Sequence, residues 1–192
     1  MNGFTDKVIN MKTQHIITGH ADEKVWGEIG LDLSKEENQF EYDIVIDKNH
    51  HKVNLDIEID IGGGFESGYS STVFAAQLHE TDFKFAVHEE HFIDEIGKFF
   101  GIEDIVIGYP ELDKHLIIKT NDAAKMKYLF SNPKARAVFE KLNNFHFGIV
   151  KRHIINVELK VPCLELFIDE AITDPPTLKK LYDAFYSILV HI

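Results

Sequence analysis

Strict alternation between apolar and polar residues in two neighbouring stretches constrains the fold more than any other feature of this sequence. In residues 53–61 every second side chain is Val, Leu or Ile, and the side chains between them are Asn, Asp or Glu. Residues 40–47 follow the same period with Phe, Tyr and Ile. A period of two is typical of a β-strand with one buried face. Because the segment DKNHHK between them offers Asp and Asn for a tight turn, the pair predicts an antiparallel hairpin.

The rest of the sequence alternates between further strand and helix patterns. Strands are expected at 69–78, around 83–87, and at 116–119, 145–150, 155–161 and 164–168. The first four strands follow one another with short links, which favours an antiparallel meander. Apolar stripes with helical spacing, together with start signals, predict the helices. They are a helix near Val25, Trp26 and Ile29, one at 92–100, one after a cap at Thr120 or Asn121, one after Asn132 and Pro133, and a last one after Asp174 and Pro175.

These patterns predict an α+β fold in which amphipathic helices pack on one face of one or more antiparallel sheets. A chain of 192 residues with 44% hydrophobic residues is long enough for one generous core. We therefore expect a single domain over residues 1–192. Each half also combines antiparallel strands with an amphipathic helix, which suggests two similar subdomains at 20–101 and 102–192.

Charge and hydropathy narrow the partners that the chain can have. With 32 acidic and 20 basic residues, the net charge is −12. This charge disfavours nucleic acid, whose phosphates require clustered Lys and Arg. No apolar run approaches the length of a membrane helix, and no basic start followed by an apolar run is present. We therefore expect a cytoplasmic protein that binds neither nucleic acid nor membranes and carries no cofactor.

A motif at residues 97–122 resembles the signature of a family of uncharacterised bacterial proteins, a domain of unknown function. The matching residues are Gly97, Lys98, Phe99, Phe100, Gly101, Asp104, Ile105, Gly108, Pro110, Asp113, Ile118, Lys119, Asn121 and Asp122. The match departs from the signature at Tyr109, Leu112 and Thr120. The resemblance implies no catalytic residues. Backbone geometry accounts for the turn and cap residues of the motif, which we interpret as a structural joint between the two halves. These residues are Gly97, Gly101, Asp104, Gly108, Pro110, Asp113, Asn121 and Asp122.

The polar face of the first hairpin is the main candidate site. Any register that buries both apolar sets also places six carboxylates on the opposite face. They belong to Glu41, Asp43, Asp47, Asp56, Glu58 and Asp60. The plainest interpretation is a solvated outer face, because carboxylates usually stay exposed. The functional alternative is a surface that recruits a basic protein or weakly binds Ca²⁺ or Mg²⁺, which favour oxygen ligands.

His88 and His91 form a second, weaker candidate. They flank two glutamates, as metal ligands can, but the spacing is not HExxH. The simpler interpretation is a pair of satisfied or solvent-facing histidines. Cys163 stands alone as the single cysteine and is expected to be a small buried apolar side chain.

Three functions remain open from the sequence. We expect a non-enzymatic binding or interaction module. The fifteen Phe residues and the long last helix leave room for a carrier of a small apolar ligand or lipid between sheet and helix. The least favoured alternative is a hydrolase that uses two carboxylates, such as Glu111 and Asp113.

Overall fold

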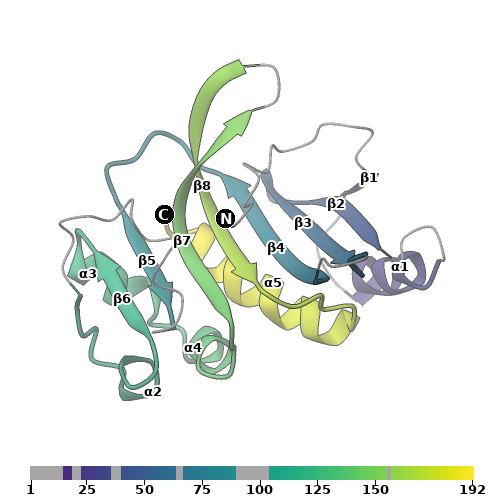
Figure 1. The fold of residues 1–192 in the computed structure, drawn as a ribbon. Helices are drawn as coiled ribbons and strands as arrows, with labels where there is room; N and C mark the ends of the chain where they lie inside the picture. Colours follow the sequence, from purple (N-terminus) through teal and green to yellow (C-terminus); the bar gives the residue numbers. More distant parts are fainter. Residues whose placement is uncertain (1–14, 19–22, 36–39, 64–66, 90–103, 155–156) are drawn as a thin grey trace.

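The computed structural model describes residues 15–18, 23–35, 40–63, 67–89, 104–154 and 157–192. These residues form one eight-stranded sheet with helices packed on it, in the strand order β1-β2-β3-β4-β8-β7-β5-β6 (Figure 1). All pairs are antiparallel except β1 and β2, which are parallel. The strands are β1 (His15–Thr18), β2 (Glu41–Lys48), β3 (His51–Asp60), β4 (Tyr69–Gln77), β5 (Phe85–His88), β6 (Ile117–Thr120), β7 (Phe145–Ile154) and β8 (Val157–Ile168). The helices are α1 (Glu23–Leu33), α2 (Pro110–Asp113), α3 (Ala123–Leu129), α4 (Pro133–Phe139) and α5 (Pro175–Leu189).

The predicted first hairpin is confirmed. Strand β2 pairs with β3 so that Ile44 lies opposite Leu55 and Ile46 opposite Val53. Asn49 and His50 connect the strands with φ values of 51° and 68°. Two successive positive φ values are the signature of a type I′ turn, whose twist matches that of the flanking strands.

The predicted four-stranded meander is wrong at its fourth strand. Strands β2, β3 and β4 are neighbours as expected, but β8 pairs with β4, and β5 lies between β7 and β6. Strand β8 runs along Thr72–Gln77 of β4, whereas β5 has four residues in all. The longer strand offers β4 more ladder hydrogen bonds and more buried apolar surface, so the β7–β8 hairpin takes the central position.

The two strands predicted at 155–161 and 164–168 are a single strand, β8, that continues through Pro162. The carbonyl oxygen of Pro162 accepts a hydrogen bond from the backbone N–H of Leu78, 2.9 Å away. In an antiparallel ladder the N–H and C=O of one residue point to the same neighbour. The N–H that proline lacks would therefore point toward the end of β4 and not toward β7, so the β7–β8 ladder stays intact.

The helix predictions are confirmed where the structure describes them, with one corrected cap. Val25, Trp26 and Ile29 of α1 are buried as expected. The cap of α3 is Asp122, whose carboxylate accepts from the N–H of Lys125 at 2.9 Å, and not Thr120 or Asn121. The expected helix at 92–100 lies outside the described residues. No sequence pattern predicts strand β1.

Helix α5 covers the inner face of the sheet, as Figure 1 shows. The predicted apolar stripe of this helix is buried throughout; its residues are Leu178, Leu181, Tyr182, Phe185 and Leu189. The ring of Phe185 contacts Phe74 of β4 and Phe147 of β7, with centroid separations of 6.1 Å in both cases. The α+β fold with helices on one face is thus confirmed. The two similar subdomains are not, because strands of both halves interleave in one sheet.

Candidate functional site

The pairing of β2 with β3 brings the six predicted carboxylates to the outer face of the sheet, opposite α5. Glu41 lies directly across from Glu58, and Asp43 directly across from Asp56. The other two have different neighbours: Asp47 lies opposite Lys52 in β3, and Asp60 opposite Tyr69 in β4. Two like-charged pairs therefore follow one another on the same face, in the half of the hairpin away from its turn. We call these six residues the acidic face.

Exposed apolar and aromatic side chains lie at the open end of this hairpin; the strand period puts Tyr69 on the acidic face, and Phe40 on the opposite side of the sheet. Ile59 donates its N–H to the carbonyl of Phe40 at 2.8 Å, which places Phe40 at the open end of the hairpin. The side chains there are half or more exposed: Phe40 by 50%, Tyr69 by 50% and Ile61 by 77%. The Tyr69 hydroxyl donates to the Glu58 carboxylate, and this bond, with burial and the neighbouring acidic charges, raises the pKa of Tyr69 to about 12.

The acidic face does not have the form of a metal centre. Its carboxylates follow two strands side by side instead of converging on one point. Within the described parts of the chain, no group of three or more His, Cys, Asp or Glu residues is placed to hold a metal ion. Metal ions such as Ca²⁺ take six to eight oxygen ligands at once, which requires convergence.

A second cluster, which the sequence did not single out, lies on the same outer face at the centre of the sheet. Glu165 of β8 is only 4% exposed. The Nε2 atom of His146 in β7 donates to Glu165 Oε1 at 3.0 Å, and the guanidinium of Arg152 forms an ion pair with the other carboxylate oxygen. Burial alone would raise the pKa of Glu165, but the His146 hydrogen bond and the Arg152 charge outweigh it and hold the pKa below its ordinary value.

His88 joins this cluster across the β5–β7 ladder, where it lies directly opposite His146. The ring of His88 is 1% exposed, and its Nδ1 donates to the carbonyl oxygen of Glu89 at 2.7 Å. Its Nε2 is buried with no hydrogen-bond partner in the described structure. Burial lowers the pKa of His88. His91, the other residue of the predicted metal pair, lies outside the described residues.

A sequence signal for this cluster exists, but it is weak. Glu165 is a lone glutamate between Leu164 and Leu166, two buried residues of the inner face. The alternation of residues in β8 places Glu165 on the outer face. Only the pairing of β8 with β7 brings Glu165 to His146 and Arg152. Cys163, two residues before Glu165, is buried, as the sequence suggested, and burial raises the pKa of its thiol to about 11.

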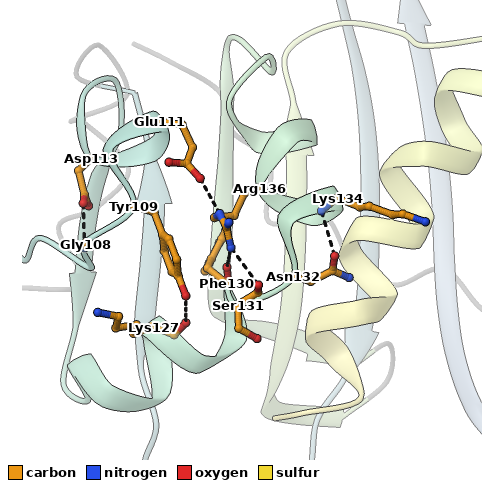
Figure 2. Close-up of polar contacts among 10 residues, drawn as sticks. All are labelled: Gly108, Tyr109, Glu111, Asp113, Lys127, Phe130, Ser131, Asn132, Lys134 and Arg136. Carbon is orange, nitrogen blue, oxygen red and sulfur yellow. Dashed lines mark hydrogen bonds and ion pairs between the residues drawn. The ribbon is translucent and has the colours of Figure 1, made fainter.

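The predicted structural joint has two parts within the described residues, and the first is the proline turn (Figure 2). Asp113 accepts hydrogen bonds from the N–H of Ile107 at 3.0 Å and of Gly108 at 2.9 Å. Gly108 has a φ of 84°, which glycine adopts without strain. Pro110 begins α2. The Asp113 carboxylate thus bonds two backbone amides within this turn.

Arg136 of α4 ties this turn to the connection between α3 and α4, as Figure 2 shows. Its Nε donates to Glu111 at 2.6 Å, and one terminal nitrogen donates to the carbonyls of Phe130 and Ser131 at 2.8 and 2.9 Å. Its guanidinium lies 4.0 Å from the ring centroid of Tyr109. Hydrogen bonds from its own backbone and from Arg136 hold the pKa of Glu111 below its ordinary value.

The second part of the joint fixes the ends of β6. Asn121 accepts from the N–H of Lys84 at 2.8 Å and donates to the carbonyl of Asp82 at 2.7 Å, which fastens the end of β6 to the segment before β5. Asp122 caps α3. Asp104 forms an ion pair with Lys119 at 3.0 Å. Gly97 and Gly101, the remaining members, lie outside the described residues.

Comparison of the chain with protein-family models, with curated proteins and with solved structures finds no match. The resemblance at residues 97–122 therefore stays a prediction. Among the helices of the described residues, none combines the length and the apolar character needed to span a membrane.

Proposed function

We propose that this protein is a non-enzymatic interaction module whose acidic face binds a basic segment of a partner protein. The observation that carries the proposal is the direct opposition of Glu41 to Glu58 and of Asp43 to Asp56. Side chains opposite each other in an antiparallel pair lie about 5 Å apart, and like charges there cost roughly 0.2–1 kcal/mol per pair. A bound Lys or Arg side chain between the strands relieves this repulsion.

The surroundings of the acidic face favour a protein partner over a free cation. Tyr69 adds an exposed aromatic ring next to the carboxylates, with its hydroxyl bonded to Glu58, and Phe40 and Ile61 are exposed at the same end of the hairpin. Aromatic residues are enriched in protein interfaces, where they supply contact area that a metal ion cannot use. The net charge of −12 also steers a basic partner toward the chain during diffusion.

The two alternative functions gain less support. A carrier needs space between sheet and helix, but aromatic rings pack against one another there: Phe139 and Phe147 have centroids 4.9 Å apart, and Phe85 and Phe147 5.3 Å. A carboxylate hydrolase needs a pair of available carboxylates. Glu111 is bonded to Arg136 and Asp113 to backbone amides, so this pair is committed to structure.

The proposal is tested by titrating the protein with a lysine-rich peptide that contains leucine and measuring the heat of binding by calorimetry. We expect binding that weakens between about 50 and about 300 mM NaCl, because salt screens exposed charges. The triple variant Glu41→Gln, Asp56→Asn, Glu58→Gln should weaken binding about tenfold, since each exposed ion pair contributes a few tenths to 1 kcal/mol.

A control variant removes the same charge elsewhere. Glu140→Gln, Asp169→Asn, Glu170→Gln changes three exposed carboxylates that are not on the acidic face. This control should bind like the unmodified protein. Equal losses in both variants would show that net charge alone attracts the peptide, and absence of binding to the unmodified protein would also contradict the proposal.

A further inference from the structure

The β5–β6 edge joins the rest of the sheet through a short ladder. Three pairs connect β5 to β7, namely Ala86 with Gly148, Val87 with Phe147, and His88 with His146. Strand β6 pairs with β5 on its other side. The strands approach closely, because a Cβ added at Gly148 would lie 2.5 Å from the carbonyl oxygen of Phe85. The β5 and β7 backbones are therefore in such close contact at Gly148 that a side chain cannot fit between them.

His88 lies in the last pair of this ladder as a neutral imidazole, and no acceptor among the described residues faces its second ring nitrogen. Its Nδ1 donates to the Glu89 carbonyl, so in the neutral ring Nε2 is the bare acceptor nitrogen. That nitrogen is buried and without a hydrogen-bond partner in the part of the chain that the structure describes. A proton there creates a charge that burial leaves poorly solvated.

Among the residues that the structure describes, the charged groups around His88 do not compensate such a charge. They are Lys119 of β6, Asp104, and His146 of β7; Glu89 adjoins His88 in the sequence, and Glu165 of β8, which pairs with Arg152, bonds to His146. The carboxylates among them are already engaged: Asp104 pairs with Lys119, Glu165 with His146 and Arg152, and Glu89 accepts from the N–H of Asn144 at 2.7 Å.

We propose that His88 is an acid-sensitive latch, in which proton uptake at Nε2 loosens the β5–β7 ladder and releases the β5–β6 edge from the sheet. The direction follows from linkage. Burial lowers the pKa of His88 in the folded chain, so the unfolded or released chain takes up a proton first. The stability of the ladder is therefore complete above the ordinary histidine pKa of about 6.5 and declines as the pH falls below it.

Backbone hydrogen exchange at about pH 7.5 and about pH 5.5, corrected for intrinsic rates, tests the latch. In the unmodified protein, the amides of β5 and β6 should lose protection on acidification by up to about tenfold per pH unit, while those of the β2–β3 hairpin change less. His88→Gln, whose side chain stays neutral, should flatten this response. His115→Gln, at an exposed histidine, should retain it.

An NMR titration of the imidazole groups keeps the test decisive if the His88→Gln protein does not fold. We expect His88 to remain the neutral Nδ1–H form down to the pH at which β5 loses protection. Titration of His88 near its ordinary value with the ladder intact would overturn the proposal. So would an unchanged acid response in His88→Gln.

Discussion

Glu165 shows how one buried carboxylate organises the centre of the outer face. Its two oxygens bind His146 and Arg152, and these two side chains come from one strand, β7, six residues apart. The ring of His146 also stacks on Phe167, with centroids 5.2 Å apart and planes inclined by 11°. Glu165 therefore links the β7–β8 ladder through side chains as well as through the backbone.

We predict that Glu165→Gln is among the most destabilising conservative changes in the chain. Removing one partner of a buried ion pair leaves the remaining charge uncompensated and costs about 3–5 kcal/mol. Urea unfolding followed by circular dichroism measures this loss. Because the pKa of Glu165 is held below its ordinary value, the contribution is present at neutral pH and is lost as the pH falls through the folded-state value.

Glu111→Gln provides the comparison for Glu165→Gln. Glu111 also bonds an arginine, but its side chain is 33% exposed, so water can replace the lost partner. The urea midpoint of unfolding should therefore shift far less in Glu111→Gln than in Glu165→Gln. Equal shifts in the two variants would contradict the view that burial makes the Glu165 pair important.

The sequence predicted whether a side chain is buried or exposed best where the period of a single strand or helix determines it. The alternation of residues 53–61 determined the buried and polar faces of β3, and the helical stripe determined the buried face of α5. Partners across the sheet were harder. The opposition of His88 to His146 depends on β7 reaching β5, a contact between segments that no local pattern encodes.

At the scale of elements, α5 depends on its first turn. Asp174 accepts from the backbone N–H of Thr177 at 3.0 Å and from the Thr177 hydroxyl at 2.6 Å. We predict that Asp174→Ala lowers the free energy of unfolding by about 1 kcal/mol, as loss of a helix cap does. Thermal unfolding measures the change. Asp169→Ala, at an exposed aspartate outside any cap, should have a smaller effect, and the reverse order would contradict this role of Asp174.

Elements that the sequence misjudged have identifiable causes. Pro162 favours the end of a strand, but the missing N–H points to the side where β4 has already ended. Strand β1 has only four residues, too few to show a period, and gains its place by pairing with β2. Both depend on a neighbouring strand, so the segment's own residues did not reveal them.

At the scale of the whole molecule, strand order was the least predictable feature. Short connections favoured a meander through β5, yet the β7–β8 hairpin inserts between β4 and β5. Long-range pairing of this kind depends on which strands bury the most apolar surface together. The outer face of the sheet consequently contains both the predicted acidic face and the unpredicted Glu165 cluster.

The distribution of charge leads to a prediction about salt. The chain has a net charge of −12, and two like-charged pairs stand directly opposite each other in the β2–β3 hairpin. Added salt shortens the screening length from about 14 Å near 50 mM to about 4 Å near 500 mM NaCl, which weakens repulsion across the surface. We predict that the melting temperature rises over this range. The triple variant Glu41→Gln, Asp56→Asn, Glu58→Gln should respond less to salt than the control Glu140→Gln, Asp169→Asn, Glu170→Gln, because it removes charges that face each other. A melting temperature that falls with salt, or equal responses in the two variants, would contradict the view that the acidic face concentrates repulsion.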